Sequence, residues 1–160
     1  MLATAAAAIL LDANSQRRRC VVSSSEDMMK MVRDCFAEAS AGNWEALPSI
    51  VTHDYVCHPE EARGPEGLAE MVAGYRAALA GLNVTIEHQF ADGDCVATRG
   101  TVRGRHEGEL MGVAATGRDV AFTTLTISRF RDGKIAEEWE LVDVPSLLVQ
   151  LGALPAPAAV

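Results

Sequence analysis

Basic charge, aromatic residues and cysteines are all scarce in this chain of 160 residues. Only 14 lysines and arginines stand against 22 aspartates and glutamates, so the formal net charge at pH 7 is −8. A surface that binds nucleic acid needs concentrated positive charge to contact phosphates. The only basic run is Arg17–Arg19, in an N-terminal tail. The sequence therefore predicts that nucleic acid is not a partner of this protein.

The four cysteines, Cys20, Cys35, Cys57 and Cys95, form no CxxC pair, and the four histidines show no ligand spacing. These patterns predict no metal site. We interpret the cysteines as free thiols of a reduced, cytoplasmic protein. No apolar run approaches the roughly 20 residues that a membrane-spanning helix needs, so we expect no membrane partner.

The length suits one domain, and 49% of the residues are apolar, enough to build a sizeable core. The first 25 residues differ in composition, because an alanine-rich start is followed by Arg17–Arg19 and then by serines. In a secretory signal the basic residues come before the apolar stretch. We interpret 1–25 as a disordered or cleavable extension, 26–153 as the folded domain and 154–160 as a flexible tail.

Helical periodicity dominates the first half of the domain. Ser25 is expected to cap a helix that ends at Gly42, and a second, short helix is expected over 44–51. An irregular connection is expected to begin at Tyr55. Gly64 and Pro65 then open a third helix, because proline suits the first helical position, and this helix is expected to stop at Gly81.

After Gly81 the apolar period changes from helical to two, as expected for strands. Turn residues predict one hairpin at Asp92-Gly93 and another at 131–134, so four long strands are expected. Helices followed by strands indicate an α+β fold. We predict a cone-shaped, curved antiparallel sheet wrapped around three N-terminal helices, with a hollow mouth that is the default ligand site.

Glu140 lies late in the last strand among apolar neighbours. Strand alternation places Trp139 and Leu141 on the face opposite Glu140. A carboxyl in an apolar cavity has its pKa raised toward neutrality, which suits a general base. The alternative is an exposed strand glutamate, as we expect for Glu137 and Glu138.

Four further candidates lie on the long strands. His106 ends a strand whose apolar face could line a pocket, or it is a solvated turn residue. Thr124 and Thr126 share a face with Phe122, where a hydroxyl could hold a substrate carbonyl. Alternatively, these threonines are present because β-branched residues favour strands.

Tyr55 and His58 are expected at the mouth of the cone. Either side chain could donate a hydrogen bond to a ligand. For Tyr55, packing on the core with the hydroxyl at the rim is an equally good interpretation.

Four segments together resemble the SnoaL-like polyketide cyclases, of the nuclear transport factor/ketosteroid isomerase-like superfamily. They are GPEGLAEMVAGYRAAL, RGRHEGELMGVAATGR, FRDGKIAEEWELVD and LLVQLG. The resemblance covers about residues 27–152, and it implies an α+β cone.

The resemblance also implies roles for individual residues. In the family an acid/base carboxylate lies six positions after the lysine of the DGKI turn, and from Lys134 that position is Glu140. Thr126 stands where the family has a pocket histidine. His106 matches a histidine of the GxH turn, and the pair of His106 and Glu140 is similar to a pair in cyclases that close pyran rings on epoxides. His58 stands where the family has an asparagine.

The resemblance leads us to expect a cofactor-independent and metal-independent ring closure of an apolar polyketide-type or related secondary metabolite. Glu140 would remove an acidic proton or activate a hydroxyl, and His106, Thr126 or Tyr55 would stabilise the oxyanion. Two alternatives stay open. One is a non-catalytic protein that binds a small molecule. The other is an epoxide-opening hydrolase or cyclase, which would need a paired Asp–Arg–Asp set, with Arg99 or Arg103 beside Asp143. A homodimer through the open sheet face is also expected.

Overall fold

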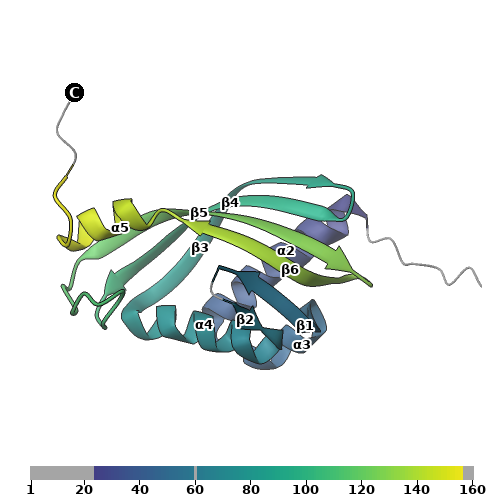
Figure 1. Cartoon of the computed structure of the whole chain (residues 1–160), viewed down its shortest axis with the longest axis horizontal. Helices are drawn as coiled ribbons and strands as arrows, with labels where there is room; N and C mark the ends of the chain where they lie inside the picture. The colour runs from purple at the N-terminus through teal and green to yellow at the C-terminus, as the bar shows by residue number, and fades with distance from the viewer. Residues whose placement is uncertain (1–23, 60, 157–160) are drawn as a thin grey trace, which may run out of the picture.

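Helices and long strands are segregated along the chain in the computed structural model, which describes residues 24–59 and 61–156 (Figure 1). The helical elements are α2 (Ser25–Ala41), the 3-10 turn η1 (Trp44–Ala46), α3 (Leu47–Ile50), α4 (Gly64–Ala78) and α5 (Val144–Leu151). The strands are β1 (Val51–His58), β2 (Ala62–Arg63), β3 (Leu79–Asp92), β4 (Cys95–His106), β5 (Asp119–Arg131) and β6 (Lys134–Val142). The predicted α+β class is confirmed. Residues 1–23 of the expected extension, Cys20 included, and 157–160 of the expected tail lie outside the described residues.

Reciprocal hydrogen bonds between Ser24 and Asp27 begin α2. The Ser24 hydroxyl accepts from the Asp27 backbone N–H at 3.1 Å, and the Asp27 carboxylate accepts from the Ser24 N–H at 3.2 Å. The cap is therefore Ser24, and our prediction of Ser25 was wrong by one residue. The reason is that Asp27 occupies the third helical position only when Ser24 is the cap. Gly42 ends the helix with φ of 79°, a conformation that favours glycine.

The six strands form one curved sheet in the order β2-β1-β6-β5-β4-β3. Our expectation of four antiparallel strands was incomplete, because β1 joins the sheet and pairs in parallel with β6. Tyr55 accordingly lies within a strand, and the irregular connection expected to begin there was wrong. The parallel partner of β1 is distant in sequence, so local patterns did not reveal it.

The register of β5 and β6 decides which side chains face the helices. Arg131 pairs with Lys134, which leaves Asp132 and Gly133 in the turn with φ of 52° and 79°. Two positive φ angles are typical of a type I′ hairpin, and the predicted turn is confirmed. The same register sets Glu140 opposite Thr126.

The concave face of the sheet packs on α2, α3 and α4, and α5 lies at the far end of the long strands (Figure 1). One buried cluster joins α2 and α3 to β1 and β6, through residues such as Val32, Leu47 and Ile135. A second cluster joins α5 to β3 and β5 through Leu79, Phe122 and Leu147. The sheet is thus held at both ends of its concave face. Within the described residues, no helix has the length and apolar character needed to cross a membrane.

The cap of α2 gives a direct test of the structure. Ser24→Ala should lower the free energy of unfolding by about 1 kcal/mol, because the Asp27 backbone N–H loses its acceptor. Ser25→Ala, one residue along, should change stability much less. Urea denaturation of both variants measures the difference. Equal losses, or a larger loss for Ser25→Ala, would contradict the assigned cap.

Candidate active site

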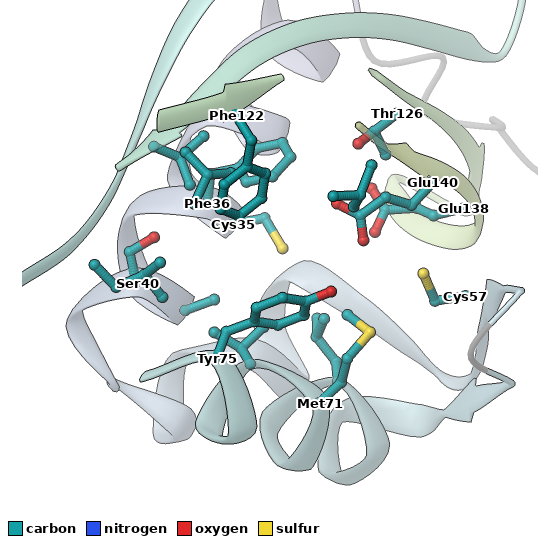
Figure 2. Close-up of a pocket in the computed structure, with 17 residues that line it drawn as sticks. Cys35, Phe36, Ser40, Cys57, Met71, Tyr75, Phe122, Thr126, Glu138 and Glu140 are labelled. Atoms are coloured by element: carbon teal, nitrogen blue, oxygen red, sulfur yellow. The ribbon is translucent and has the colours of Figure 1, made fainter. Parts of the chain in front are cut away.

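A cavity opens between α2, α4 and the concave face of the sheet (Figure 2). The cavity has a volume of about 90 Å³. One water molecule needs about 10–15 Å³, so the side chains around the cavity do not fill it. The helices contribute Cys35, Phe36, Ala39, Ser40, Leu68, Met71, Val72 and Tyr75. The strands contribute Cys57, Leu82, Val84, Val102, Phe122, Thr126, Glu138, Glu140 and Val142.

Two carboxyl groups enter this mostly apolar cavity from the same strand. Glu138 and Glu140 are two residues apart on β6, so both project from its concave face, and Figure 2 shows their side chains next to each other. Among the described residues, no lysine, arginine or histidine lines the cavity. The polar groups of this described lining are carboxyls, hydroxyls and thiols.

Glu140 is half-buried at the cavity wall. The Thr124 hydroxyl donates to its Oε1 at 2.8 Å, which orients the carboxylate. The neighbours Trp139 and Leu141 lie on the other face, as strand alternation predicted. Leu141 is 67% exposed, and Trp139 stacks on His58 at a ring distance of 5.9 Å. Glu140 is therefore not an ordinary surface glutamate.

Glu138 is buried, and our expectation that it is exposed was wrong. Tyr55 donates to its Oε2 at 2.5 Å, and Ser128 donates to its Oε1. Desolvation raises the pKa of Glu138 above its usual range, and these two hydrogen bonds offset that rise only in part. The sequence could have indicated this burial, because Glu138 is two residues before Glu140 and therefore lies on the same face of the strand.

Burial also keeps the groups around Glu138 protonated. Desolvation first, and then the nearby Glu138 charge, raise the pKa of the Tyr55 phenol far above its usual range. The same two causes raise the pKa of the Cys35 thiol. Tyr55 is therefore a permanent hydrogen-bond donor. Cys35 is a poor nucleophile, because the thiolate is the reactive form.

The threonines and Phe122 of β5 lie where the alternation placed them. Thr126 and Phe122 are buried and line the cavity. The Thr126 hydroxyl has no hydrogen-bond partner among the described residues, so a ligand oxygen could take it. Thr124 does not line the cavity, and its contact with the site is its bond to Glu140.

Three other candidates lie away from the cavity lining. His106 is completely buried, and its Nδ1 accepts from the Thr116 backbone N–H at 3.2 Å, so the structure does not bring it to the cavity with Glu140. His58 is on the outer face of the sheet, 3.2 Å from Glu137. Tyr55 is not at a mouth, and it reaches the site only through Glu138.

The cavity also includes residues that sequence analysis did not place in a site. Met71 and Tyr75 lie on α4, and in Figure 2 the Tyr75 hydroxyl points toward the side of the cavity that holds the two carboxyls. Phe36 forms part of the opposite wall. An apolar stripe looks the same in sequence whether it lines a cavity or fills a core.

Comparison with known proteins identifies the family of the chain. The family model described as SnoaL-like polyketide cyclase matches residues 26–151. The chain belongs to this family. This SnoaL-like chain is 28% identical to the aklanonic acid methyl ester cyclase DauD of Streptomyces sp. (strain C5). The match extends over 128 residues and covers 76% of this chain and 80% of DauD.

Solved structures of Streptomyces proteins share the fold of this SnoaL-like chain. IdmH of Streptomyces antibioticus is 32% identical with a TM-score of 0.70, over 78% of this chain and 98% of IdmH. TsrD of Streptomyces laurentii is 25% identical with a TM-score of 0.75, over 81% of this chain and 97% of TsrD. The fold expected from the resemblance is therefore confirmed.

The raised pKa of Glu138 predicts that stability falls as pH rises. The folded state keeps the Glu138 proton above the pH at which the unfolded chain releases it, so the free energy of unfolding decreases above the usual glutamate range. The slope from this single group is at most about 1.4 kcal/mol per pH unit.

Denaturation in urea at a series of pH values measures this slope. Glu138→Gln should flatten it, because the amide does not titrate. Glu137→Gln, on the outer face of the same strand, should leave the slope almost unchanged. A wild-type slope that Glu138→Gln does not alter would mean that Glu138 ionises normally.

Proposed function

We propose that this protein is a cyclase that closes a ring within a polyketide-type or related substrate by acid/base chemistry, with Glu140 as the base. The observation that carries the proposal is a half-buried carboxylate, oriented by Thr124, at the wall of an apolar cavity. The substrate class comes from DauD, an aklanonic acid methyl ester cyclase that resembles this chain.

The chemistry needs one group to move a proton and a cavity that orients the substrate. Glu140 takes the proton from a carbon between two carbonyls, and the electron pair moves onto a carbonyl oxygen. The resulting enolate carbon attacks another carbonyl of the same molecule, a carbon–carbon bond forms, and the new alkoxide takes the proton back. The Thr126 hydroxyl is placed to donate to an oxyanion. The cavity encloses the substrate and so holds the two reacting carbons close together, and the reaction consumes no cofactor.

Thr126 also supports a second candidate, a non-catalytic protein that holds an apolar ligand. In the family resemblance a histidine stands at this position, and a threonine hydroxyl cannot exchange protons near neutral pH as histidine can. The epoxide-opening alternative has less support. Arg99 and Arg103, the arginines considered for it, contact Glu87 and Thr85 and do not line the cavity.

Replacing Glu140 separates the cyclase from the binding protein. Glu140→Gln should lower kcat by about 10²- to 10⁴-fold, the usual contribution of a general base, while the Kd changes little. The probe is aklanonic acid methyl ester, with measurement of both ring closure and binding.

Glu137→Gln is the matched control, and it should turn over like the wild type because Glu137 faces away from the cavity. Near-wild-type turnover of Glu140→Gln would contradict the assignment of the base. Tight binding without turnover by the wild type would favour the non-catalytic alternative.

We also propose that the protein is a homodimer that pairs through the outer face of the sheet. This face exposes Leu125, Ile127, Leu141 and Phe90, and the cross-strand pairing sets Leu125 opposite Leu141. Exposed apolar side chains on neighbouring strands favour association.

Light scattering should give twice the mass of one chain for the wild type. Leu125→Asp should give one chain mass, because a charge would be buried between the copies. A monomeric wild type would contradict the dimer.

A further inference from the structure

A surface groove between α2 and β3 adjoins the cavity. It has a volume of about 560 Å³. The groove and the cavity share Phe36 and Ser40 of α2 and Leu82 and Val84 of β3 in their walls. The residues that line the groove alone are Arg33, Ala37, Ala41, Asn83 and Ile86. Two hollows with four wall residues in common are neighbours, so one ligand can occupy both.

The cavity is too small for a molecule of several rings. Its volume is about 90 Å³. An engineered protein cavity of about 150 Å³ holds a single benzene molecule. The enclosed space therefore takes only a small part of a polycyclic polyketide, such as the dicarbonyl arm that reacts. The fused rings of such a molecule need space outside the cavity.

The position of the carboxyls sets the direction in which a ligand extends. In Figure 2 Glu138 and Glu140 lie on one side of the cavity, and Phe36 and Ser40 lie on the other side. Phe36 and Ser40 are also the two residues of α2 that the cavity shares with the groove. A molecule whose reacting carbon lies next to Glu140 therefore extends toward the groove.

The walls of the groove suit a flat aromatic ring system. They are mostly apolar, and Phe36 contributes an aromatic ring on which another ring can pack. Ala37 and Ala41 are exposed, and each carries only a methyl group. The groove is therefore open along this face of α2, opposite the apolar side chains of Val84 and Ile86 on β3.

A guanidinium lies in the groove. Arg33 lines it, and Nη1 of Arg33 donates to Oε1 of Gln89 on β3 at 2.7 Å. Gln89 is itself held, because its Nε2 donates to the backbone oxygen of Met29 and to the Thr98 hydroxyl, both at 3.2 Å. A guanidinium carries five N–H donors, and its charge strengthens a hydrogen bond to an acidic oxygen. Arg33 therefore suits a carboxylate or a phenolate of a ligand.

We propose that the groove is a second subsite, which holds the fused aromatic rings of a polyketide while the cavity holds the dicarbonyl arm that reacts. Arg33 binds an acidic oxygen on these rings, remote from the arm. The inference rests on the proposed function for the chemical class of the ligand. It narrows that class to aromatic polyketides with two or more fused rings and an acidic group far from the reacting dicarbonyl.

Binding of two diketones tests the ring subsite. Pentane-2,4-dione consists of the reacting arm alone, whereas 1-(2-naphthyl)butane-1,3-dione carries two fused rings beside the arm. The wild type should bind the naphthyl compound more tightly by about tenfold or more, because its rings are removed from water in the groove. Isothermal titration calorimetry measures both Kd values. Equal Kd values, or no binding of either compound, would overturn the inference.

A variant that fills the groove locates the rings. Ala37→Trp occupies the groove without changing the lining of the cavity, because Ala37 lines the groove alone. It should remove the advantage of the naphthyl compound and leave the Kd of pentane-2,4-dione unchanged. Ala73→Trp is the matched control, since Ala73 is an exposed residue of α4 that lines neither hollow. Naphthyl binding to Ala37→Trp as tight as in the wild type or tighter, or an equal loss in Ala73→Trp, would overturn the subsite.

A carboxyl group on the second ring tests Arg33. Arg33→Met should weaken the binding of the 6-carboxynaphthyl diketone by about threefold, the usual size of an exposed ion pair, and should leave the uncharged naphthyl compound unchanged. Lys30→Met also removes a positive charge from α2, but Lys30 pairs with Asp34 and does not line the groove. It should affect neither compound. Equal effects of the two variants, or no effect of Arg33→Met, would overturn the role of Arg33.

Kinetics separate this inference from the proposed function. With aklanonic acid methyl ester, Ala37→Trp should raise KM about tenfold with little change in kcat, because the groove binds rings and takes no part in proton transfer. Turnover that Ala37→Trp alters in neither KM nor kcat would overturn the subsite alone. A wild type without turnover, but with naphthyl binding that Ala37→Trp weakens, would contradict the cyclase and support the subsite.

Discussion

Two carboxyl groups enter one mostly apolar cavity, and the chemistry proposed for the site depends on how deeply each is buried. In water Glu138 and Glu140 would both ionise. In the structure, hydroxyl groups from outside the cavity lining donate to both carboxyls, Thr124 to Glu140 and Tyr55 to Glu138. Hydroxyl donors stabilise a carboxylate less than a cation does. The fold buries Glu138 more deeply than Glu140, although both side chains project from the same face of β6.

Strand pairing creates this difference in burial. At Glu138, β6 is paired with β1 on one side and with β5 on the other. Tyr55 of β1 and Ser128 of β5 both donate hydrogen bonds to its carboxyl group. Glu140 lies two residues on, beyond the last residue of β6 that pairs with β1, and borders the cavity with Val142. The parallel pairing of β1 thus does more than extend the sheet. It covers one carboxyl and leaves its neighbour accessible.

The sequence predicted the parts of this arrangement that are local. Alternation and turn residues located the hairpin of β5 and β6, and with the family resemblance they led to Glu140. The strand parity of Glu140 applies equally to Glu138, which we expected to be exposed like Glu137. The role of Tyr55 could not be predicted, since it depends on a parallel partner about 80 residues away.

The surroundings of His106 and of the cavity-lining residues of α4 could not be predicted either, because they depend on the path of a loop and on the shape of the whole sheet. His106 ends a strand with apolar alternation, yet the backbone of Thr116 occupies its Nδ1 in a loop whose path no periodicity predicts. Whether Met71 and Tyr75 fill a core or line a cavity depends on the curvature of the sheet, which is a property of all strands together.

A crystal structure with an aromatic 1,3-diketone bound tests the central claim most directly. The account predicts that the ligand occupies the cavity, with the carbon between the carbonyls next to Glu140 and one carbonyl oxygen within hydrogen-bonding distance of Thr126. A ligand bound on the outer face, or a cavity that stays empty while Glu140 turns to solvent, would contradict it.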